Sequence, residues 1–443
     1  MGVMDTLPER VLQFGEGVFL RAFFDPMVDR MNERGLFGGR VVVVQPIAEG
    51  LVDVLNAQGG SYTLILRGLQ NGRVVNDRFR IGSIRRGIDP YRDFGTFLEA
   101  AHNPELRFIV SNTTEAGIAF RPGDRFDDAP PSSFPGKLTR FLYGRYTAGL
   151  PGFVLLPCEL IDRNGDNLRR TVLETAANWR LPQAFRDWVT GANVFANTLV
   201  DRIVTGYPKD EAAALSAELG YEDRLLDTAE PFLFWAIEAP AEVERELPLR
   251  EAGFDVVWTD GLKPYRDRKV HILNGAHTAM TMVALLAGKE TVGECMADPA
   301  IRGWVEAAID EEIIPTLTLP RVELEQFARA VLERFSNPFI RHQLMSIALN
   351  SVSKYKTRVL PTVERYVAMN GRPPARLSQS LGALIEVYRS GRFPVKDDPA
   401  ILKMFAARPD AGDVLARADW WGRDLRELPG FEEMVRRGTE ISG

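Results

Sequence analysis

The sequence predicts an α/β protein in which a domain with a mostly parallel sheet, residues 1–260, precedes a mainly α-helical domain, residues 261–443. Three observations support this prediction. The chain of 443 residues is too long for one ordinary domain. In its first part, short apolar runs alternate with amphipathic stretches, which is typical of a parallel sheet covered by helices. After about residue 261, long helical periodicities dominate.

The expected strands of the first domain are short apolar runs that end in glycine or polar residues. They cover residues 11–14, 41–44, 62–66, 108–110 and 153–156. The run of four valines at 41–44 is typical of a strand buried on both faces. An amphipathic helix is expected between the first two strands, at 20–32. The helices expected in the second domain cover residues 269–287, 302–314, 322–335 and 378–390.

The composition narrows the class of partner. A net charge of -6 argues against nucleic acid, which normally requires a basic face. An acidic small molecule remains compatible, because a few converging cations override the global sign inside a pocket. No apolar run reaches the ~18 residues of a membrane helix. With two distant cysteines, Cys158 and Cys295, no disulfide framework is expected. We therefore expect a cytoplasmic protein with a small-molecule ligand, whose oligomeric state the sequence does not give.

A glycine loop, FGEGVFLR at residues 14–21, lies between the first expected strand and the first expected helix. A dinucleotide-binding loop belongs at this place, because small residues let the backbone approach a pyrophosphate beside a helix N-terminus. Leu20 replaces the third glycine of the usual pattern, and Arg21 could meet a phosphate instead. A simple tight turn is the alternative. The candidate cofactor-binding residues here are Phe14, Gly15, Gly17, Phe19 and Arg21.

Two further strand ends extend the cofactor site of this Rossmann-like domain. An acid at the end of the second strand would favour NAD, since it binds the ribose hydroxyls. The residue there is Gln45, which can hydrogen-bond a hydroxyl but does not repel a 2′-phosphate; Glu49 is a nearby substitute. NAD is expected and NADP is not excluded. The residues that end the strand at 108–110 are also candidates: Asn112, Thr113 and Thr114.

Lys269, Asn274 and His277 form the most informative group. On an α-helix at about 100° per residue they fall on one side and span about two turns. His271 points elsewhere, so the two histidines of this segment cannot chelate one metal ion. A solvated polar face is the alternative interpretation. However, the helix is otherwise apolar, and polar groups there are costly unless they line a cavity or pair.

Carbonyl reduction fits this group. A lysine can supply the proton to the forming alkoxide, and an asparagine amide can stabilise the developing negative charge. A neutral histidine can orient a substrate hydroxyl. A second segment, Asn197 with Asp201 and Arg202, has the spacing of neighbouring turns, although Asp201 with Arg202 is more often a structural ion-paired cap.

These motifs resemble the mannitol dehydrogenase family of polyol-specific long-chain dehydrogenases. The resemblance rests on the spacing of Lys269, Asn274 and His277, on the glycine loop, and on residues 114–117 and 197–202. It covers nearly the whole chain. It implies an NAD-dependent oxidoreductase without catalytic zinc. Within the family, the chain looks most similar to members that interconvert D-tagaturonate and D-altronate in hexuronate catabolism.

The resemblance also implies roles for single residues. Lys269 would be the acid/base, Asn197 and Asn274 would hold the carbonyl oxygen, and His277 would bind substrate. Glu115 would pass the proton between Lys269 and water. Lys354 matches a substrate-contacting lysine of the family.

Lys354 and Arg358 are expected to read the carboxylate of a sugar acid. At i,i+4 on a helix they would share a face, where an anion relieves the repulsion of like charges. A solvated basic surface is the alternative. Asp201 and Arg202 complete the set of substrate-binding candidates.

Other functions stay open at this point. Reduction of D-fructuronate or oxidation of D-mannitol would use the same residues with another substrate stereochemistry. A non-catalytic binder of nucleotide or sugar acid belongs to a different class. A metal-dependent enzyme is not favoured, since four histidines and two cysteines show no zinc-ligand spacing.

Overall fold

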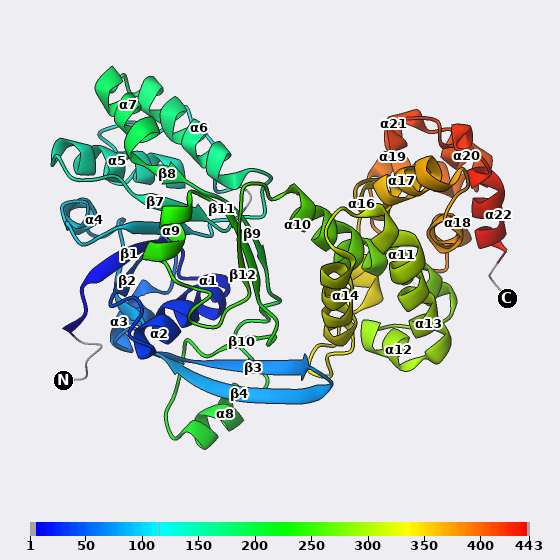
Figure 1. Cartoon of the computed structure of the whole chain (residues 1–443), viewed down its shortest axis with the longest axis horizontal. Helices are drawn as coiled ribbons and strands as arrows, with labels where there is room; N and C mark the ends of the chain where they lie inside the picture. The colour runs from blue at the N-terminus through cyan, green and yellow to red at the C-terminus, as the bar shows by residue number, and fades with distance from the viewer. Residues whose placement is uncertain (1–5, 115, 441–443) are drawn as a thin grey trace. The chain divides into compact units, whose positions relative to one another are not determined.

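The computed structural model describes residues 6–114 and 116–440. The chain forms two compact units, Met1–Arg67 with Val75–Leu262, and Gly68–Val74 with Lys263–Gly443. The first unit combines sheets with helices, and the second is helical apart from a hairpin tip (Figure 1). The predicted fold class is therefore confirmed.

A six-stranded parallel sheet organises the first unit, in the order β5-β2-β1-β6-β7-β8. Its strands are β1 (Glu9–Phe14), β2 (Arg40–Val44), β5 (Ile84–Ile88), β6 (Phe108–Ser111), β7 (Val154–Pro157) and β8 (Val194–Phe195). Four of the expected strands, at 11–14, 41–44, 108–110 and 153–156, lie in this sheet. The edge strand β5 was not expected, because two of its five residues are arginines.

The expected strand at 62–66 exists, but it lies outside the parallel sheet. It begins β3 (Tyr62–Gln70), which pairs with β4 (Arg73–Ile81) and β10 (Asp227–Ala229) in a separate sheet. A third sheet contains β9 (Asn197–Asp201), β11 (Phe234–Glu238) and β12 (Val256–Thr259). An apolar run in the sequence predicts that a strand forms. It does not predict which sheet the strand joins, because this also depends on segments far away in the sequence.

Helices cover the sheets of the first unit. The helix expected at 20–32 is divided at Phe24 into α1 (Val18–Phe23) and α2 (Asp25–Glu33). Pro26 lies in the first turn of α2, where its missing N–H leaves no bond unmade, so a new helix begins there. The remaining helices are α3 (Val52–Ala57), α4 (Phe94–Ala100), α5 (Phe134–Thr147), α6 (Asn164–Asn178), α7 (Gln183–Ala192), α8 (Ala212–Leu219) and α9 (Ala241–Glu246).

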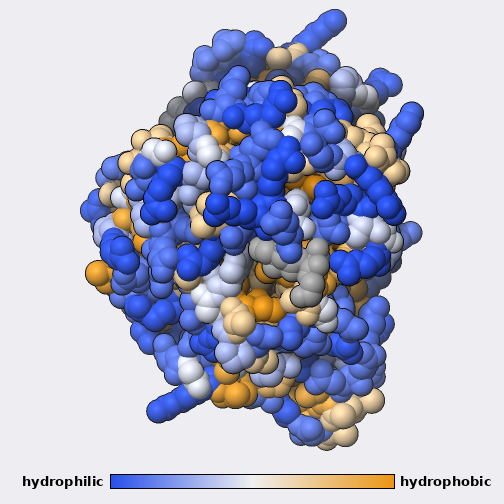
Figure 2. Space-filling model, turned by 90° about the vertical axis from the view of Figure 1, so that its right-hand side faces the viewer, coloured by the Kyte–Doolittle hydropathy of each residue, from blue (hydrophilic) through white to orange (hydrophobic). Residues whose placement is uncertain are grey.

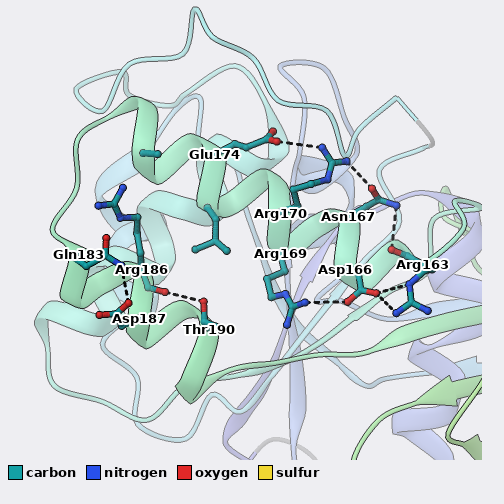
Figure 3. Close-up of a pocket in the computed structure, with 12 residues that line it drawn as sticks. Arg163, Asp166, Asn167, Arg169, Arg170, Glu174, Gln183, Arg186, Asp187 and Thr190 are labelled. Carbon is teal, nitrogen blue, oxygen red and sulfur yellow. Dashed lines mark hydrogen bonds and ion pairs between the residues drawn. The ribbon is translucent and has the colours of Figure 1, made fainter.

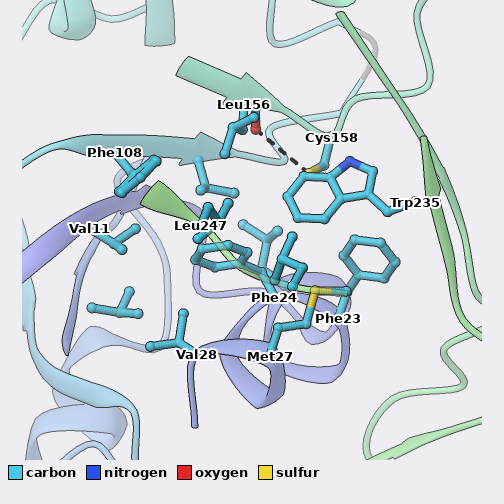
Figure 4. Close-up of a cluster of buried hydrophobic side chains, with 14 of the residues drawn as sticks. Val11, Phe23, Phe24, Met27, Val28, Phe108, Leu156, Cys158, Trp235 and Leu247 are labelled. Atoms are coloured by element: carbon cyan, nitrogen blue, oxygen red, sulfur yellow. Dashed lines mark hydrogen bonds between the residues drawn. The ribbon is translucent and has the colours of Figure 1, made fainter. Parts of the chain in front are cut away.

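The two faces of the parallel sheet support separate apolar clusters. Val11 and Leu12 are neighbours on β1 but belong to different clusters, because successive side chains of a strand point to opposite faces. In the first cluster, the ring of Trp235 meets Phe23 edge-on at 5.4 Å between centroids and Phe24 at 6.0 Å (Figure 4). Trp235 lies on β11, so this packing holds α1, and with it the glycine loop, against the sheet of β9, β11 and β12.

The second unit is a helical domain. Its elements are α10 (Lys263–Arg268), η2 (Lys269–Gly275), α11 (Ala276–Leu286), α12 (Val292–Ala297), α13 (Pro299–Ala307), η3 (Ala308–Ile313), η4 (Ile314–Thr316), α14 (Arg321–Phe335), α15 (Leu344–Ile347), α16 (Ser351–Arg358), α17 (Leu360–Asn370), α18 (Ala375–Ser390), α19 (Pro399–Ala406), α20 (Ala411–Leu415), α21 (Ala418–Trp421), η5 (Leu425–Glu427) and α22 (Phe431–Thr439). The helices expected at 322–335 and 378–390 are confirmed as α14 and α18. Those expected at 269–287 and 302–314 each contain a π-helical stretch, η2 and η3.

The turn between β3 and β4 also belongs to the second unit. The backbone N–H groups of Asn71 and Gly72 donate to the carboxylate of Glu333 on α14, at 3.0 and 2.7 Å. The face of the molecule shown in Figure 2 is mostly hydrophilic, with small apolar patches. Among the described residues, no helix combines the length and the apolar character needed to cross a membrane.

Candidate active site

The glycine loop has the geometry of a turn that brings backbones close together. Gly15 adopts φ +117°, and a Cβ there would lie 3.0 Å from the carbonyl oxygen of Asn112. Its N–H donates to the carbonyl of Val44 at 3.1 Å, so this glycine joins the ends of β1 and β2. Gly17 is exposed, and a Cβ there would meet nothing within 4 Å. The loop is therefore rigid at its first glycine and open to a ligand at its second.

Two cofactor candidates of this loop instead hold the core together. Phe14 is fully buried and packs on Phe134, with 4.8 Å between ring centroids. Arg21 is 2% exposed; its guanidinium donates to the carbonyls of Glu16 and Leu225 and lies 3.8 Å from Asp227. The expectation that Arg21 meets a phosphate is corrected, because its hydrogen-bonding groups are directed into the protein.

Two further cofactor candidates, Phe19 and Gln45, also contact neighbouring parts of the protein. Phe19 is half-buried and stacks on Phe23 at 5.0 Å. The amide of Gln45 donates to the carbonyls of Ile47 and Ala48, so it braces the loop after β2.

The residues after β6 are also braced. Asn112 donates to the carbonyl of Cys158 at 2.9 Å, and Thr113 donates through N–H and hydroxyl to Glu159. Thr114 is exposed at φ +69°. The side chains of Asn112 and Thr113 therefore brace the loop. Glu115 lies outside the described residues.

A π-helix presents the central polar group of the second unit. Lys269 and Asn274 are the first and sixth residues of η2, and a π-helix closes its turns between residues i and i+5. The two side chains therefore lie one turn above each other on nearly the same face. The α-helical geometry expected from the sequence placed them farther apart around the axis. His277 follows in the first turn of α11.

His271, which the sequence interpretation set aside, anchors this π-helix. Its Nε2 accepts from the Arg365 guanidinium at 2.6 Å, since an arginine can only donate. Its Nδ1 therefore carries the proton and donates to the carbonyl of Arg358 at 2.8 Å. The contact joins η2 to the C-terminal end of α16. The sequence signal that could have revealed this anchor was a histidine on the side of the helix opposite Lys269 and Asn274.

His277 lies in an aromatic and cationic surrounding. Its ring stacks on Phe335 at 4.8 Å and meets His342 edge-on at 4.9 Å. Its Nε2 is enclosed and makes no hydrogen bond to any described residue. Burial, together with the smaller effect of the charges of His342, Arg358, Lys354 and Arg334, lowers the pKa of His277 to about 3. The ring is therefore neutral, and a ligand hydroxyl would satisfy the enclosed nitrogen.

This pKa predicts an acid-sensitive contribution to stability. An unfolded histidine titrates near 6.5. Between that pH and about 3 the unfolded state binds a proton that the native ring does not, so the free energy of unfolding falls as the pH drops below 6.5. We therefore expect the free energy of unfolding of His277→Gln, taken relative to that of the wild type, to rise by about 1 kcal/mol as the pH falls from 6 to 5. Urea unfolding at pH 7, 6 and 5 measures it; a difference independent of pH would contradict the assignment.

Lys354 and Arg358 share α16, as the sequence predicted. The Nζ of Lys354 donates to the carbonyl of Ile347 at 2.8 Å. Burial lowers the pKa of Lys354, and the neighbouring charge of Arg358 adds to this effect, whereas Asp397 opposes it. Burial also lowers the pKa of Arg358. Both cations are half-buried, which disfavours the alternative of a fully solvated basic surface.

The segment at 197–202 lies in the first unit and serves its structure. The amide nitrogen of Asn197 donates to carboxylate oxygens of Asp166 and Glu238, at 3.3 and 3.2 Å. Arg202 donates to the carbonyls of Glu230 and Ala22. Asp201 is 4% exposed on β9. In this structure, the polar groups of Asn197 and Arg202 bind protein partners, and the roles of Asn197, Asp201 and Arg202 toward substrate stay predictions.

A cavity of about 790 Å³ lies between α6 and α7. Four arginines line it, and three of them pair with acids: Arg163 and Arg169 with Asp166, and Arg170 with Glu174 (Figure 3). None of the predicted site residues lines this cavity. Among residues 6–114 and 116–440, no three His, Cys, Asp or Glu side chains gather as metal ligands would.

The comparisons with known proteins agree across the chain. Residues 9–251 match the family model of the mannitol dehydrogenase Rossmann domain, and residues 261–440 match that of the mannitol dehydrogenase C-terminal domain. The sequence is 51% identical over 449 residues to an altronate oxidoreductase of Klebsiella pneumoniae (strain 342), covering 97% of this chain and 93% of that protein. An altronate oxidoreductase of Escherichia coli O17:K52:H18 is 49% identical over 98% of this chain and 94% of its own.

Two solved structures share the fold. Mannitol 2-dehydrogenase of Pseudomonas fluorescens, in a ternary complex with NAD and D-mannitol, has a TM-score of 0.71 and 23% identity over 99% of this chain and 92% of that chain. A substrate-free D-sorbitol dehydrogenase has a TM-score of 0.82 and 23% identity over 99% of this chain and 96% of its own.

Proposed function

Because the chain belongs to the mannitol dehydrogenase family, we propose that it is an altronate oxidoreductase, which reduces D-tagaturonate to D-altronate reversibly with NAD. The observation that carries the proposal is the identity of about half of all residues with altronate oxidoreductases along both domains. Reduction of D-fructuronate and oxidation of D-mannitol are the alternatives within the family.

The first unit would hold the dinucleotide. The residues present fit it: Gly17 leaves its outer face open, and Gly15 fixes the loop at the carboxyl edge of the sheet. A dinucleotide pyrophosphate approaches the backbone of such a loop, where a larger side chain would obstruct it. When bound, NAD supplies the acceptor or donor of the hydride.

The second unit would carry the proton transfer. The Lys269 ammonium donates a proton to the carbonyl oxygen as a hydride reaches the carbonyl carbon, and the amine takes this proton back in the reverse reaction. Asn274, one π-turn away, donates a hydrogen bond to the same oxygen and stabilises its developing charge. The enclosed Nε2 of neutral His277 holds a substrate hydroxyl.

Sugar-acid specificity is supported by the cations of α16. Lys354 and Arg358 both act on His277 through their charges, so they lie near it. A substrate carboxylate would offset the mutual repulsion of these half-buried cations. Each charged hydrogen bond of this kind contributes about 1.5–3 kcal/mol. A neutral ketose would leave the cations uncompensated.

Replacing Lys354 with methionine is therefore expected to raise KM for D-tagaturonate about 10- to 100-fold while kcat changes less. The side chain keeps its length and loses its charge. Lys356→Met, two residues along the same helix, is the matched control and should retain the wild-type KM. Initial rates measured against substrate concentration give the KM of each variant. Equal KM values for the wild type and Lys354→Met would remove Lys354 from the carboxylate site.

Product identification tests the reaction itself. Purified protein with NADH and D-tagaturonate should consume both in a one-to-one ratio and release D-altronate, distinguished from D-mannonate by NMR. Consumption of NADH with a different product would show that the family is right and the substrate wrong.

A further inference from the structure

Glu16, the residue between the two glycines of the loop, is not explained by the fold. It is 7% exposed. Its Oε1 accepts from the backbone N–H of Leu51 at 3.4 Å. Its Oε2 is enclosed, and within residues 6–114 and 116–440 it makes no hydrogen bond. A buried carboxylate oxygen without a donor costs free energy, and a ligand that supplies a donor would offset this cost.

The surrounding cations do not neutralise this carboxylate. Arg21 is directed at the backbone carbonyl of Glu16, at 3.1 Å, and at Leu225 and Asp227. Burial raises the pKa of Glu16, and Asp89 raises it further, whereas Arg21 and backbone hydrogen bonds lower it. The carboxylate therefore has capacity for another donor.

The position of Glu16 relative to the sheet suggests which donor this is. Phe14, Val44 and Ile88 are in register at the ends of β1, β2 and β5. Glu16 thus lies at the carboxyl edge, beside the end of β2. A Cβ on Gly50 would lie 2.1 Å from its Oε1 and 2.5 Å from the Oε1 of Gln45, so the loop after β2 passes directly against both side chains.

In doubly wound folds, an acid at the end of the second strand binds the hydroxyls of the adenosine ribose. Here that position is Gln45, whose amide N–H groups are already donated to Ile47 and Ala48. We propose that Glu16 takes over this function: its free carboxylate oxygen accepts from the ribose 2′-hydroxyl of NAD and repels the 2′-phosphate of NADP. The inference rests on the proposed function, and it assigns the cofactor preference to a residue of the glycine loop.

The test compares NADH and NADPH binding to the full-length protein by fluorescence titration, without a sugar substrate. The wild type should bind NADH more tightly. Glu16→Gln keeps the size of the side chain and an acceptor for Leu51, and removes the charge. We expect it to shift the ratio of the two Kd values toward NADPH by about 10- to 100-fold, by weakening NADH and strengthening NADPH binding.

Two variants sharpen the test. Glu49→Gln tests the competing carboxylate of the loop after β2, which the sequence offered as a substitute for Gln45; because Glu49 is exposed, the inference expects the ratio to stay within about twofold. Glu16→Asp keeps the charge and shortens its reach, so it should weaken NADH binding and still reject NADPH.

The outcomes separate the inference from the proposed function. A ratio that moves in Glu49→Gln but not in Glu16→Gln would overturn the assignment, as would a wild type that prefers NADPH or binds neither dinucleotide. Tight NADH binding with the expected shift, but no turnover of D-tagaturonate, would support Glu16 and contradict only the proposed substrate.

Discussion

Replacing Lys269 with alanine is expected to lower kcat for D-tagaturonate reduction about 10²- to 10⁴-fold. The variant lacks the group that donates a proton to the forming alkoxide, and water at that place is a poorer and less well oriented acid. NADH binding should stay close to the wild type, because the glycine loop belongs to the other unit. Single-turnover rates and NADH titration measure the two effects separately.

Lys263→Ala is the matched control for this variant. Lys263 is exposed on the preceding helix α10 and forms an ion pair with Asp267 there. Its loss should leave kcat within about twofold, as is usual for surface charges. Undiminished turnover in Lys269→Ala would remove this lysine from the mechanism, whatever the control shows.

Replacing Asn274 with alanine is expected to lower kcat about 10²- to 10³-fold with a smaller change in KM. The reason is that its amide bonds more strongly to the developing oxyanion than to the ground-state carbonyl. Asn370→Ala, at the exposed end of α17, is the control. A change confined to KM would mean that Asn274 binds substrate without stabilising the transition state.

The sequence was most informative where a pattern has one physical cause. The valines of β2 are buried, and β2 lies inside the sheet between β5 and β1, as an uninterrupted apolar run predicts. Gly15 and Gly17 likewise mark the strand-to-helix turn, because a turn of this kind requires residues without a side chain. The separate sheet of β3 could not be predicted, because its partner β10 lies more than 150 residues away in the sequence.

The candidate site could be predicted in part. Lys269, Asn274 and His277 lie together because they are close in sequence, yet the π-helix that aligns the first two depends on tertiary contacts. One of these is the approach of Gly275 to the carbonyl of Arg358, where a Cβ would lie 2.8 Å away. A periodicity of 3.6 residues carries no sign of this.

The roles of the charged candidate residues were harder to predict from the sequence. Arg21 and Arg202 have the residue type of phosphate or substrate ligands, but both are buried and donate to backbone carbonyls. Residue type alone does not say whether a guanidinium faces a ligand or holds loop carbonyls that have no partner in a sheet. Glu16, which no sequence pattern singled out, emerged only from its unsatisfied oxygen.

The most direct test of the central claim measures NADH oxidation by the wild-type protein with D-tagaturonate, D-fructuronate and D-fructose side by side, without added metal. A kcat/KM that is highest for D-tagaturonate, and lowest for D-fructose, which has no carboxylate, is the predicted result. A preference for D-fructuronate or D-fructose would keep the family and the Lys269 chemistry but contradict the substrate, and no oxidation with any of the three would contradict the proposed reaction.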